Sequence, residues 1–271
     1  MLRRTKSIKP VYIVGDVHGQ YAKLVALLRD AGLMDGNWRW SGGNARLWFM
    51  GDFFDRGPDG VSSVDLVMRL QHEAAEAGEA GGEVNSLLGN HEILFLGAHK
   101  FGRQRSESIF TVGWLRNGGV LSDLDRISAE HIAWLTQLPA LALVEDRLFM
   151  HADAKFYTEY GDSIEEVNRN IYEILRGDDW YKWEHLLDVF SERMTFFNPF
   201  AEGVGQTRRI LETFGGSQII HGHTPIHYME ASLKPAGIHE PFAYNDALCL
   251  NMDGAMCLGG TGFVYQLPLY G

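Results

Sequence analysis

The sequence predicts an α/β fold, because short apolar runs alternate with helical patterns and each run ends abruptly at a cluster of polar residues. The runs are too short for helices and are bounded by glycine, which is typical of buried strands. Five runs show this pattern: residues 11–14, 47–50, 84–88, 148–150 and 217–220. Ligands of such sheets lie beyond the carboxyl ends of the strands, so we expect the five polar clusters to form one site.

Two helical patterns separate the first three predicted strands. Residues 21–31 and 61–70 carry apolar side chains three and four positions apart, which is the period of a helix with one buried face. The order strand, helix, strand, helix, strand predicts parallel strands joined by right-handed crossovers.

The second half of the chain departs from this alternation. Residues 156–214 are rich in Trp, Tyr and Phe and show helical patterns at 164–175 and 183–190, so we expect a helical insertion covering one side of the site. After His223, three short runs with a Gly259-Gly260 turn predict β-hairpins. These runs are 247–252, 255–258 and 262–267. We found neither an internal repeat nor a linker and therefore expect residues 1–271 to form one domain.

Charge and composition exclude several classes of partner. The 271 residues include 24 Lys and Arg against 35 Asp and Glu, a net charge of −11 with histidine neutral. Binding to a nucleic-acid backbone needs clustered basic residues, so we expect no nucleic-acid partner. No run approaches the roughly 18 apolar residues of a membrane-spanning helix, and we expect no membrane association. Cys249 and Cys257 are too few for a disulfide framework; we expect a cytoplasmic protein, of undetermined oligomeric state.

The polar clusters that end the predicted strands supply Asp, Asn and His side chains but no thiolate. Ligands of this kind suit manganese, iron or zinc better than copper(I) or an iron–sulfur cluster. Six ligands exceed what one tetrahedral zinc binds, but suit two ions roughly 3.5–4 Å apart that share one carboxylate. The clusters are Gly15-Asp16-Val17-His18-Gly19, Gly51-Asp52-Phe53-Phe54-Asp55-Arg56-Gly57, Gly89-Asn90-His91-Glu92, His151-Ala152-Asp153 and His221-Gly222-His223-Thr224.

The position of each residue suggests its place around such ions. Asp16 and His18 lie two residues apart, so both can turn toward one ion where the strand opens into a loop. Asp52 follows the adjacent predicted strand and is the natural bridge between the ions. Taken singly, each cluster also has a structural interpretation: Asp52 could cap a helix, Asn90 is a common turn residue and His151 could be a core histidine. Five clusters in this order favour the metal site.

The ordered motifs GDVHG, GDFFDRG, GNHE, HAD and HGHTP resemble those of the metallophosphoesterase superfamily. Within it they are most similar to the phosphoprotein phosphatase branch, in particular to the small protein phosphatases of bacteria and phages. Residues 114–119 (WLRNGG) add to this likeness, which covers residues 11–267. The resemblance implies a calcineurin-like domain: a sandwich of two mixed β-sheets flanked by helices, with the helical insertion beside the site.

The resemblance also implies a dinuclear centre with a definite ligand set. Asp16 and His18 would hold the first ion, and Asp52 would bridge the two. The second ion would be held by Asn90, His151 and His223. The family aligns its ligand with the second histidine of HGHTP, which favours His223, while His221 remains the alternative. Among divalent metals we expect two manganese ions, with iron or zinc as alternatives.

Further residues receive roles in catalysis. The two ions would lower the pKa of a bridging water so that hydroxide exists near neutral pH. His91 would protonate the leaving alkoxide and Asp55 would orient His91. Arg56 offers a two-pronged contact for the phosphate, with Asn90 also contacting the substrate. A second arginine that contacts phosphate is usual in the family, and Arg193 is the candidate. The sequence is equally consistent with Arg193 being a solvent-exposed helix residue without this role.

Two departures from the family pattern concern contacts to the substrate rather than the metals. Leu88 stands where the phage-type enzymes have an arginine before GNHE, and Met252-Asp253-Gly254 lacks the Ser or Thr common between that Asp and Gly. One phosphate contact is therefore missing or comes from elsewhere.

Three functions remain open. The first is a metal-dependent phosphomonoesterase acting on phosphoserine and phosphothreonine in proteins, with phosphotyrosine or a small phosphoester as further substrates. The second is a symmetrical dinucleoside-tetraphosphate hydrolase. In that case Arg103 and Arg105 would bind the polyphosphate, and Phe101 would contact the base. The third is a catalytically silent metal-binding scaffold, which intact His91 and Asp55 disfavour.

Overall fold

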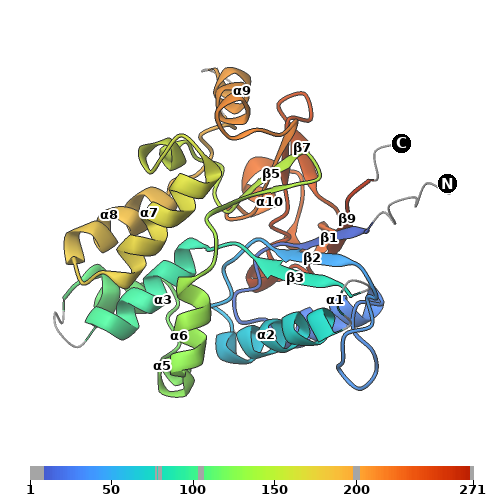
Figure 1. The fold of residues 1–271 in the computed structure, drawn as a ribbon, viewed down its shortest axis with the longest axis horizontal. Coiled ribbons are helices and arrows are strands. Elements are labelled where there is room, and N and C mark those ends of the chain that lie inside the picture. The colour runs from blue at the N-terminus through green and yellow to red at the C-terminus, as the bar shows by residue number, and fades with distance from the viewer. Residues whose placement is uncertain (1–8, 77, 79–80, 103–106, 198–201, 269–271) are drawn as a thin grey trace.

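Two mixed β-sheets form the centre of the fold (Figure 1). The computed structural model describes residues 9–76, 78, 81–102, 107–197 and 202–268. The sheets have the strand orders β3-β2-β1-β9 and β4-β5-β6-β8-β7. The strands are β1 (Val11–Val14), β2 (Arg46–Phe49), β3 (Glu83–Ser86), β4 (Leu141–Val144), β5 (Arg147–Met150), β6 (Gln218–His221), β7 (Phe242–Tyr244), β8 (Cys249–Asn251) and β9 (Val264–Gln266).

Strand direction explains why the polar clusters meet. β1, β2 and β3 are parallel neighbours, and so are β5, β6 and β8. Each of the five predicted strands ends within two residues of its expected boundary, and its polar cluster follows directly. The α/β prediction is therefore confirmed, and the two mixed sheets implied by the resemblance are present.

Alternating side chains divide the core into two layers. Ile13 and Phe149 belong to the smaller cluster between the sheets, whereas their neighbours Val14 and Leu148 belong to the larger cluster on the outer faces. This alternation follows from the two-residue period of a strand. Trp48 meets Phe149 edge to face across the sandwich, with ring centroids 5.5 Å apart. Both faces of each sheet are thus covered, which suits short and strongly apolar strands.

Helices cover the outer faces of the sheets and surround the site. In Figure 1, α1 and α2 lie against the β1–β3 side, and α3, α5 and α6 lie together beyond the end of β3. The helices before the insertion are α1 (Tyr21–Asp30), α2 (Gly60–Glu76), α3 (Asn90–Phe101), the π-helix η2 (Ile109–Gly113), α4 (Trp114–Arg116), α5 (Leu121–Arg126) and α6 (Ala129–Thr136).

The insertion is helical, as expected, and packs on α3. Its elements are η3 (Phe156–Glu159), α7 (Ile164–Arg176), α8 (Trp180–Phe190) and α9 (Gly203–Phe214). The Ser163 and Asp179 side chains accept hydrogen bonds from the first turns of α7 and α8, which is how N-caps stabilise helices. Helix α8 packs on α3 and α7 lies beside α8, whereas α9 packs on β6 (Figure 1). Of the insertion, α8 therefore covers one side of the chain around Asn90.

The predicted C-terminal hairpins are wrong in their pairing. Residues 255–258 contain a short 3₁₀ helix, η5 (Met256–Leu258), instead of a strand. β9 pairs with β1 in the first sheet, whereas β8 pairs with β6 and β7 in the second. Apolar patterning identifies buried strands but carries no information about the sheet to which a strand adds. Two further short helices, α10 (Ile226–Met229) and η4 (Pro235–Gly237), complete this region.

Among the helices that the structure describes, none combines the length and apolar character needed to cross a bilayer.

Candidate active site

The loops after β1, β2, β3, β5 and β6 bring the predicted site residues together. Several of these residues hold a left-handed backbone conformation, which is unfavourable for residues other than glycine. His18, Asp52, Asp55, Arg56 and His223 have φ of 44°, 55°, 68°, 66° and 67°. Strained conformations of this kind concentrate at functional sites, where the surrounding fold holds them in place.

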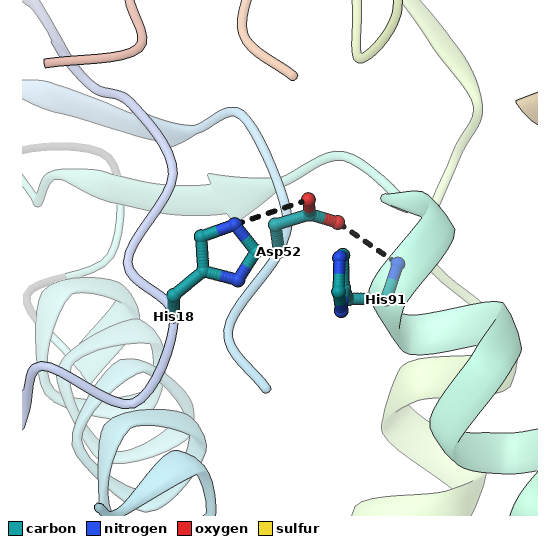
Figure 2. Close-up of side chains that lie close together, drawn as sticks. All are labelled: His18, Asp52 and His91. Atoms are coloured by element: carbon teal, nitrogen blue, oxygen red, sulfur yellow. Dashed lines mark hydrogen bonds and ion pairs between the residues drawn. The ribbon is translucent and has the colours of Figure 1, made fainter. Parts of the chain in front are cut away.

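A first group of potential metal ligands comprises His18, Asp52 and His91, and all three are buried. The His18 Nε2 atom lies 3.6 Å from Asp52 Oδ2. The backbone N–H of His91, in the first turn of α3, donates to Asp52 Oδ1 at 2.9 Å. Figure 2 shows both contacts, with the His18 ring directed at the carboxylate of Asp52.

A second group comprises Asp52, His151 and His223, also buried. His151 Nε2 lies 3.3 Å from Asp52 Oδ1. Asn90 Oδ1 lies 3.1 Å from His151 Nε2 and 2.9 Å from His223 Nδ1. Asp52 is therefore common to both groups, and the position of its carboxylate suits a ligand shared by two ions.

Backbone carbonyls determine which ring nitrogens remain available. His18 Nδ1 lies 3.0 Å from the Phe54 carbonyl, and His151 Nδ1 lies 2.7 Å from the Met50 carbonyl. A carbonyl oxygen only accepts, so each Nδ1 carries a proton and each Nε2 is turned toward Asp52. Metal-binding histidines are commonly oriented in this way.

The site also contains a buried nitrogen without a partner. His223 Nε2 is one of the buried polar atoms that make no hydrogen bond among the described residues. An unsatisfied buried polar atom is costly, and a cation bound there would satisfy it. Imidazole nitrogens together with carboxylate and amide oxygens are ligands that divalent manganese, iron and zinc accept. The residues present therefore fit a pair of divalent ions.

The pKa shifts in this cluster follow from burial and mutual charge. Burial lowers the pKa of His18 and of His223 well below the usual value. Burial acts in the same direction on His151, but Asp52 and Asp16 outweigh it and raise the pKa of His151 to about 10. Burial disfavours the charged form of Asp52, yet the nearby histidines hold its pKa well below the usual value. A positive charge is thus favoured beside the Asp52 carboxylate.

Asp16 lies at the edge of this cluster. Its carboxylate oxygens accept the backbone N–H of His223 at 2.9 and 3.1 Å. Burial, together with Asp253 and Asp52, raises the pKa of Asp16 well above its usual value. Among the described residues, Asp16 belongs to neither group of converging ligand atoms, and its observed contact is to the loop that carries His223.

A second set of contacts surrounds the His91 ring. Its Nδ1–H donates to Asp55 Oδ2 at 2.6 Å, and the Trp114 indole N–H donates to Asp55 Oδ1 at 2.7 Å. Burial lowers the pKa of His91 to about 4 and raises the pKa of Asp55 to about 8. Asp55 thereby orients the ring, and His91 Nε2 is left facing the site.

Arg56 joins the two sets of contacts. Its guanidinium donates from Nη1 to His18 Nε2 at 2.8 Å and from Nη2 to His91 Nε2 at 2.9 Å. Its backbone N–H donates to the Gly118 carbonyl at 2.8 Å. Gly118 has φ of 93°, and an added Cβ would lie 2.9 Å from the Arg56 backbone nitrogen. The glycines of WLRNGG therefore support the loop that aims Arg56.

Arg193 is exposed. After burial, which is the largest cause, its charge contributes to lowering the pKa of both His91 and His223, which indicates a position near the site. Asp153 holds the adjacent turn. Its side chain accepts the backbone N–H of Met194 at 3.1 Å, and its carbonyl accepts that of Thr195 at 3.1 Å. Met194 has φ of 61°, so this turn is held against its conformational preference.

His221 differs from His223 in having both ring nitrogens engaged. Its Nε2 lies 2.8 Å from the Tyr244 hydroxyl, and its Nδ1 lies 2.9 Å from the Gly222 carbonyl. These contacts favour His223 over His221 as a metal ligand.

Sequence reasoning assigned no role to Glu92, which is completely buried. Its carboxylate accepts the backbone N–H groups of Asp52 at 2.7 Å, Phe53 at 2.7 Å and Gly89 at 2.9 Å. Glu92 thus ties the loop after β2 to the start of α3. The sequence did contain a pattern that indicates this role, since an acid three residues after a helix cap is typical of a capping box.

Three other sequence observations concern residues near the site. Leu88 is buried in the larger core cluster, so it offers no polar contact to a phosphate. Arg103 and Arg105 lie outside the described residues. The buried Asp253 was noted only as a departure, yet it adds to the charge around Asp16.

Comparisons with known proteins identify a family that this chain resembles. A family model described as calcineurin-like phosphoesterase matches residues 9–227. Shewanella-like protein phosphatase 2 of Arabidopsis thaliana is 36% identical over 93 residues, which are 34% of this chain and 23% of that protein. The symmetrical bis(5'-nucleosyl)-tetraphosphatase of Enterobacter sp. (strain 638) is 25% identical over 205 residues, or 75% of this chain and 63% of that protein. The chain thus spans less than two thirds of the length of these curated relatives.

Among solved structures, the fold is similar to that of a cold-active protein-tyrosine phosphatase of a psychrophilic Shewanella species. The TM-score is 0.73 at 23% sequence identity, covering 96% of this chain and 76% of that one. At this level of identity the likeness shows a common fold.

Proposed function

The chain belongs to the calcineurin-like phosphoesterase family, and from this premise we propose that it hydrolyses phosphoesters as a metal-dependent protein phosphatase. Its substrates are phosphoserine and phosphothreonine in proteins, with phosphotyrosine as a further substrate. One observation carries most of this proposal: the Asp52 carboxylate lies between two groups of buried histidines, beside an arginine and an oriented His91.

We assign the metal ligands as follows. Asp16 and His18 would hold one divalent ion, and Asn90, His151 and His223 would hold the other. Asp52 would be shared by the two ions. When bound, such ions supply Lewis-acid chemistry that activates water and neutralises phosphate charge. The unpartnered Nε2 atom of His223 and the convergence of His18 and His151 on Asp52 support this assignment, and we expect manganese as the metal.

His91 acts as the general acid in this proposal. When it is protonated on both nitrogens, Nδ1–H stays on Asp55 and Nε2–H faces the site, where it protonates the leaving oxygen of the phosphoester. The 2.6 Å contact to Asp55 supports this role, since a carboxylate stabilises the imidazolium and fixes its orientation.

Arg56, Asn90 and Arg193 bind the phosphoryl oxygens in this proposal. The Arg56 guanidinium presents parallel N–H donors, which match phosphate geometry. The Asn90 amide and the exposed Arg193 approach the same region from α3 and from the turn after α8. Arg193 supplies the second arginine that Leu88 does not.

A symmetrical dinucleoside-tetraphosphate hydrolase is the second candidate, because the bacterial enzymes of that name match 75% of this chain. A direct comparison separates the two. Rates on a panel of phosphopeptides and on diadenosine tetraphosphate should be measured side by side at fixed manganese. We expect higher kcat/KM on phosphopeptides, and faster cleavage of the dinucleotide would favour the second candidate. Inactivity on all substrates with both metals bound would instead support a silent scaffold.

A further inference from the structure

A groove of about 680 Å³ opens beside the candidate metal ligands, between α3, η2 and the insertion helix α8. Asn90 forms one part of its lining, so the groove continues directly from the site. Leu94 and Ile109 contribute apolar surface, and Tyr181 stands on the opposite wall with 72% of its surface exposed. The groove is therefore open to a ligand larger than a phosphate group.

Asn90 offers a hydrogen-bond donor at the end of this groove. The residue is only 6% exposed, and its Oδ1 is occupied by His151 and His223. Within the part of the chain that the structure describes, its Nδ2 donates to no acceptor. This nitrogen is not sealed from solvent, so it can donate a hydrogen bond to a group that binds in the groove.

The far wall of the groove is acidic. Glu184 and Asp188 lie four positions apart on α8, and Tyr181 lies three positions before Glu184, so the three share one helix face. Neither acid forms an ion pair with any residue the structure describes, and the described lining includes neither Lys nor Arg. The remaining titratable residue, His185, lies 3.6 Å from Glu159. The groove thus carries two unpaired negative charges beside an aromatic ring.

We propose that this groove binds the polypeptide on one side of the phosphorylated residue and selects a Lys or Arg side chain there. This inference rests on the proposed function and deepens it. A cationic side chain would meet Glu184 and Asp188 electrostatically and the face of Tyr181 through a cation–π contact. The chain of a dinucleoside tetraphosphate would be repelled by the same two acids. The preferred substrate is therefore a phosphoprotein segment with a basic neighbour.

The test compares two phosphopeptides. The first carries basic residues on each side of the phosphoserine, and the second is identical except that alanine replaces each basic residue. The variant Glu184→Gln/Asp188→Asn removes both charges with little change in shape. The control Asp30→Asn/Glu212→Gln makes the same chemical changes on exposed residues of α1 and α9. All rates are divided by the same protein's rate on p-nitrophenyl phosphate, at fixed manganese.

We expect the wild-type chain and the control to prefer the basic peptide by about fivefold to tenfold in kcat/KM, as two exposed ion pairs allow. The groove variant should lose most of this preference, and added salt should weaken it in the wild type. Equal rates on the two peptides, or an unchanged preference in the groove variant, would overturn the inference while leaving the phosphatase assignment intact. Absence of hydrolysis of every phosphomonoester, p-nitrophenyl phosphate included, would overturn the proposed function itself.

Discussion

The indole N–H of Trp114 donates a hydrogen bond to the Asp55 carboxylate at 2.7 Å, although the two residues are 59 positions apart. The other oxygen of that carboxylate accepts from His91. Trp114 and the His91 ring are therefore linked through one buried acid. A hydrogen bond to a carboxylate favours its charged form, so the indole opposes the effect of burial, which raises the pKa of Asp55 to about 8.

Replacing Trp114 by phenylalanine tests this link. Trp114→Phe keeps an aromatic ring but removes the donor, so we expect kcat to fall about tenfold, in line with a lost hydrogen bond to a charged group. Metal content, measured by mass spectrometry, should not change. Trp134→Phe is the matched control, since the Trp134 indole donates to Gln71 instead. Equal kcat values for the two variants would show that the Trp114 contact is only structural.

His91→Ala tests the general acid. We expect turnover of a phosphoserine peptide to fall by about 10²–10⁴-fold, whereas p-nitrophenyl phosphate should suffer less, because its leaving group needs little protonation. Metal content should stay near two ions per chain, about what a dinuclear site holds. His91 also lies among the potential ligands of the first group, so collapse of the metal content would mean that it is a ligand and not the acid.

Asp52→Asn tests whether Asp52 is the ligand shared by the two metal ions. Asp52 is the residue common to both ligand groups, and an amide cannot supply its charge, so we expect loss of both ions and of measurable activity. Asp65→Asn serves as a control, because Asp65 pairs with His131 on α6, outside both groups. Retention of both ions by Asp52→Asn would refute the bridging role.

The stability of metal-free protein should fall as pH rises from about 6.5 to about 10. Against the opposing effect of burial, Asp52 raises the pKa of His151 to about 10, so the stabilisation from its proton is complete below pH 6.5 and is lost toward pH 10. Burial raises the pKa of Asp55 to about 8, and this group also binds more protons in the folded state. The free energy of unfolding therefore decreases with pH in this range.

Urea unfolding in the presence of a chelator, followed by tryptophan fluorescence at several pH values, measures this trend. His151→Gln should flatten it, and added manganese should restore stability at high pH by binding the folded state. Stability that rises with pH in the metal-free wild type would contradict the charge arrangement around Asp52.

Asp153 and Arg193 should act as one unit in substrate binding. Asp153 holds the Met194 backbone, so Asp153→Ala should release the turn that positions Arg193 and raise KM for phosphopeptides by about fivefold to tenfold, the effect of losing one charge-assisted contact. Arg193→Ala should raise KM similarly. If Asp153 acts through Arg193, the double variant should be no worse than Arg193→Ala alone. Additive effects would show that Asp153 contributes independently.

The sequence was sufficient to predict the strands that carry the site but not all of their partners. β1, β2, β5 and β6 are short and mainly apolar, so the sequence pattern of each strand alone predicts it. β3 (Glu83–Ser86) is less apolar, and the Leu87-Leu88 pair beyond it completes its apolar run. β9 was predicted as part of a hairpin, yet it pairs with β1 at the other end of the chain. Backbone pairing between distant segments depends on which sheet edge is open, and that information is not local.

The residues of the site likewise divide into those that the sequence could predict and those that it could not. Asp52, Asn90, His151 and His223 each lie one to four residues after the end of a strand, so their place at the carboxyl ends of strands could be predicted. Their convergence across two sheets could not. Glu92 and Trp114 were not assigned roles, because their functions consist of contacts to the backbone of Asp52 and to the side chain of Asp55. Such contacts depend on loop conformation and on helix placement.

The sequence by itself thus determined the α/β class, the family likeness and the residues capable of binding metal, because each is encoded in short motifs at strand ends. Only the tertiary structure decided how these residues meet. The carboxylate of Asp16 accepts the backbone N–H of His223 across 207 positions, and Asp153 holds Met194 across 41. Contacts over such separations form only when packing of the two sheets and the helical insertion brings the loops together.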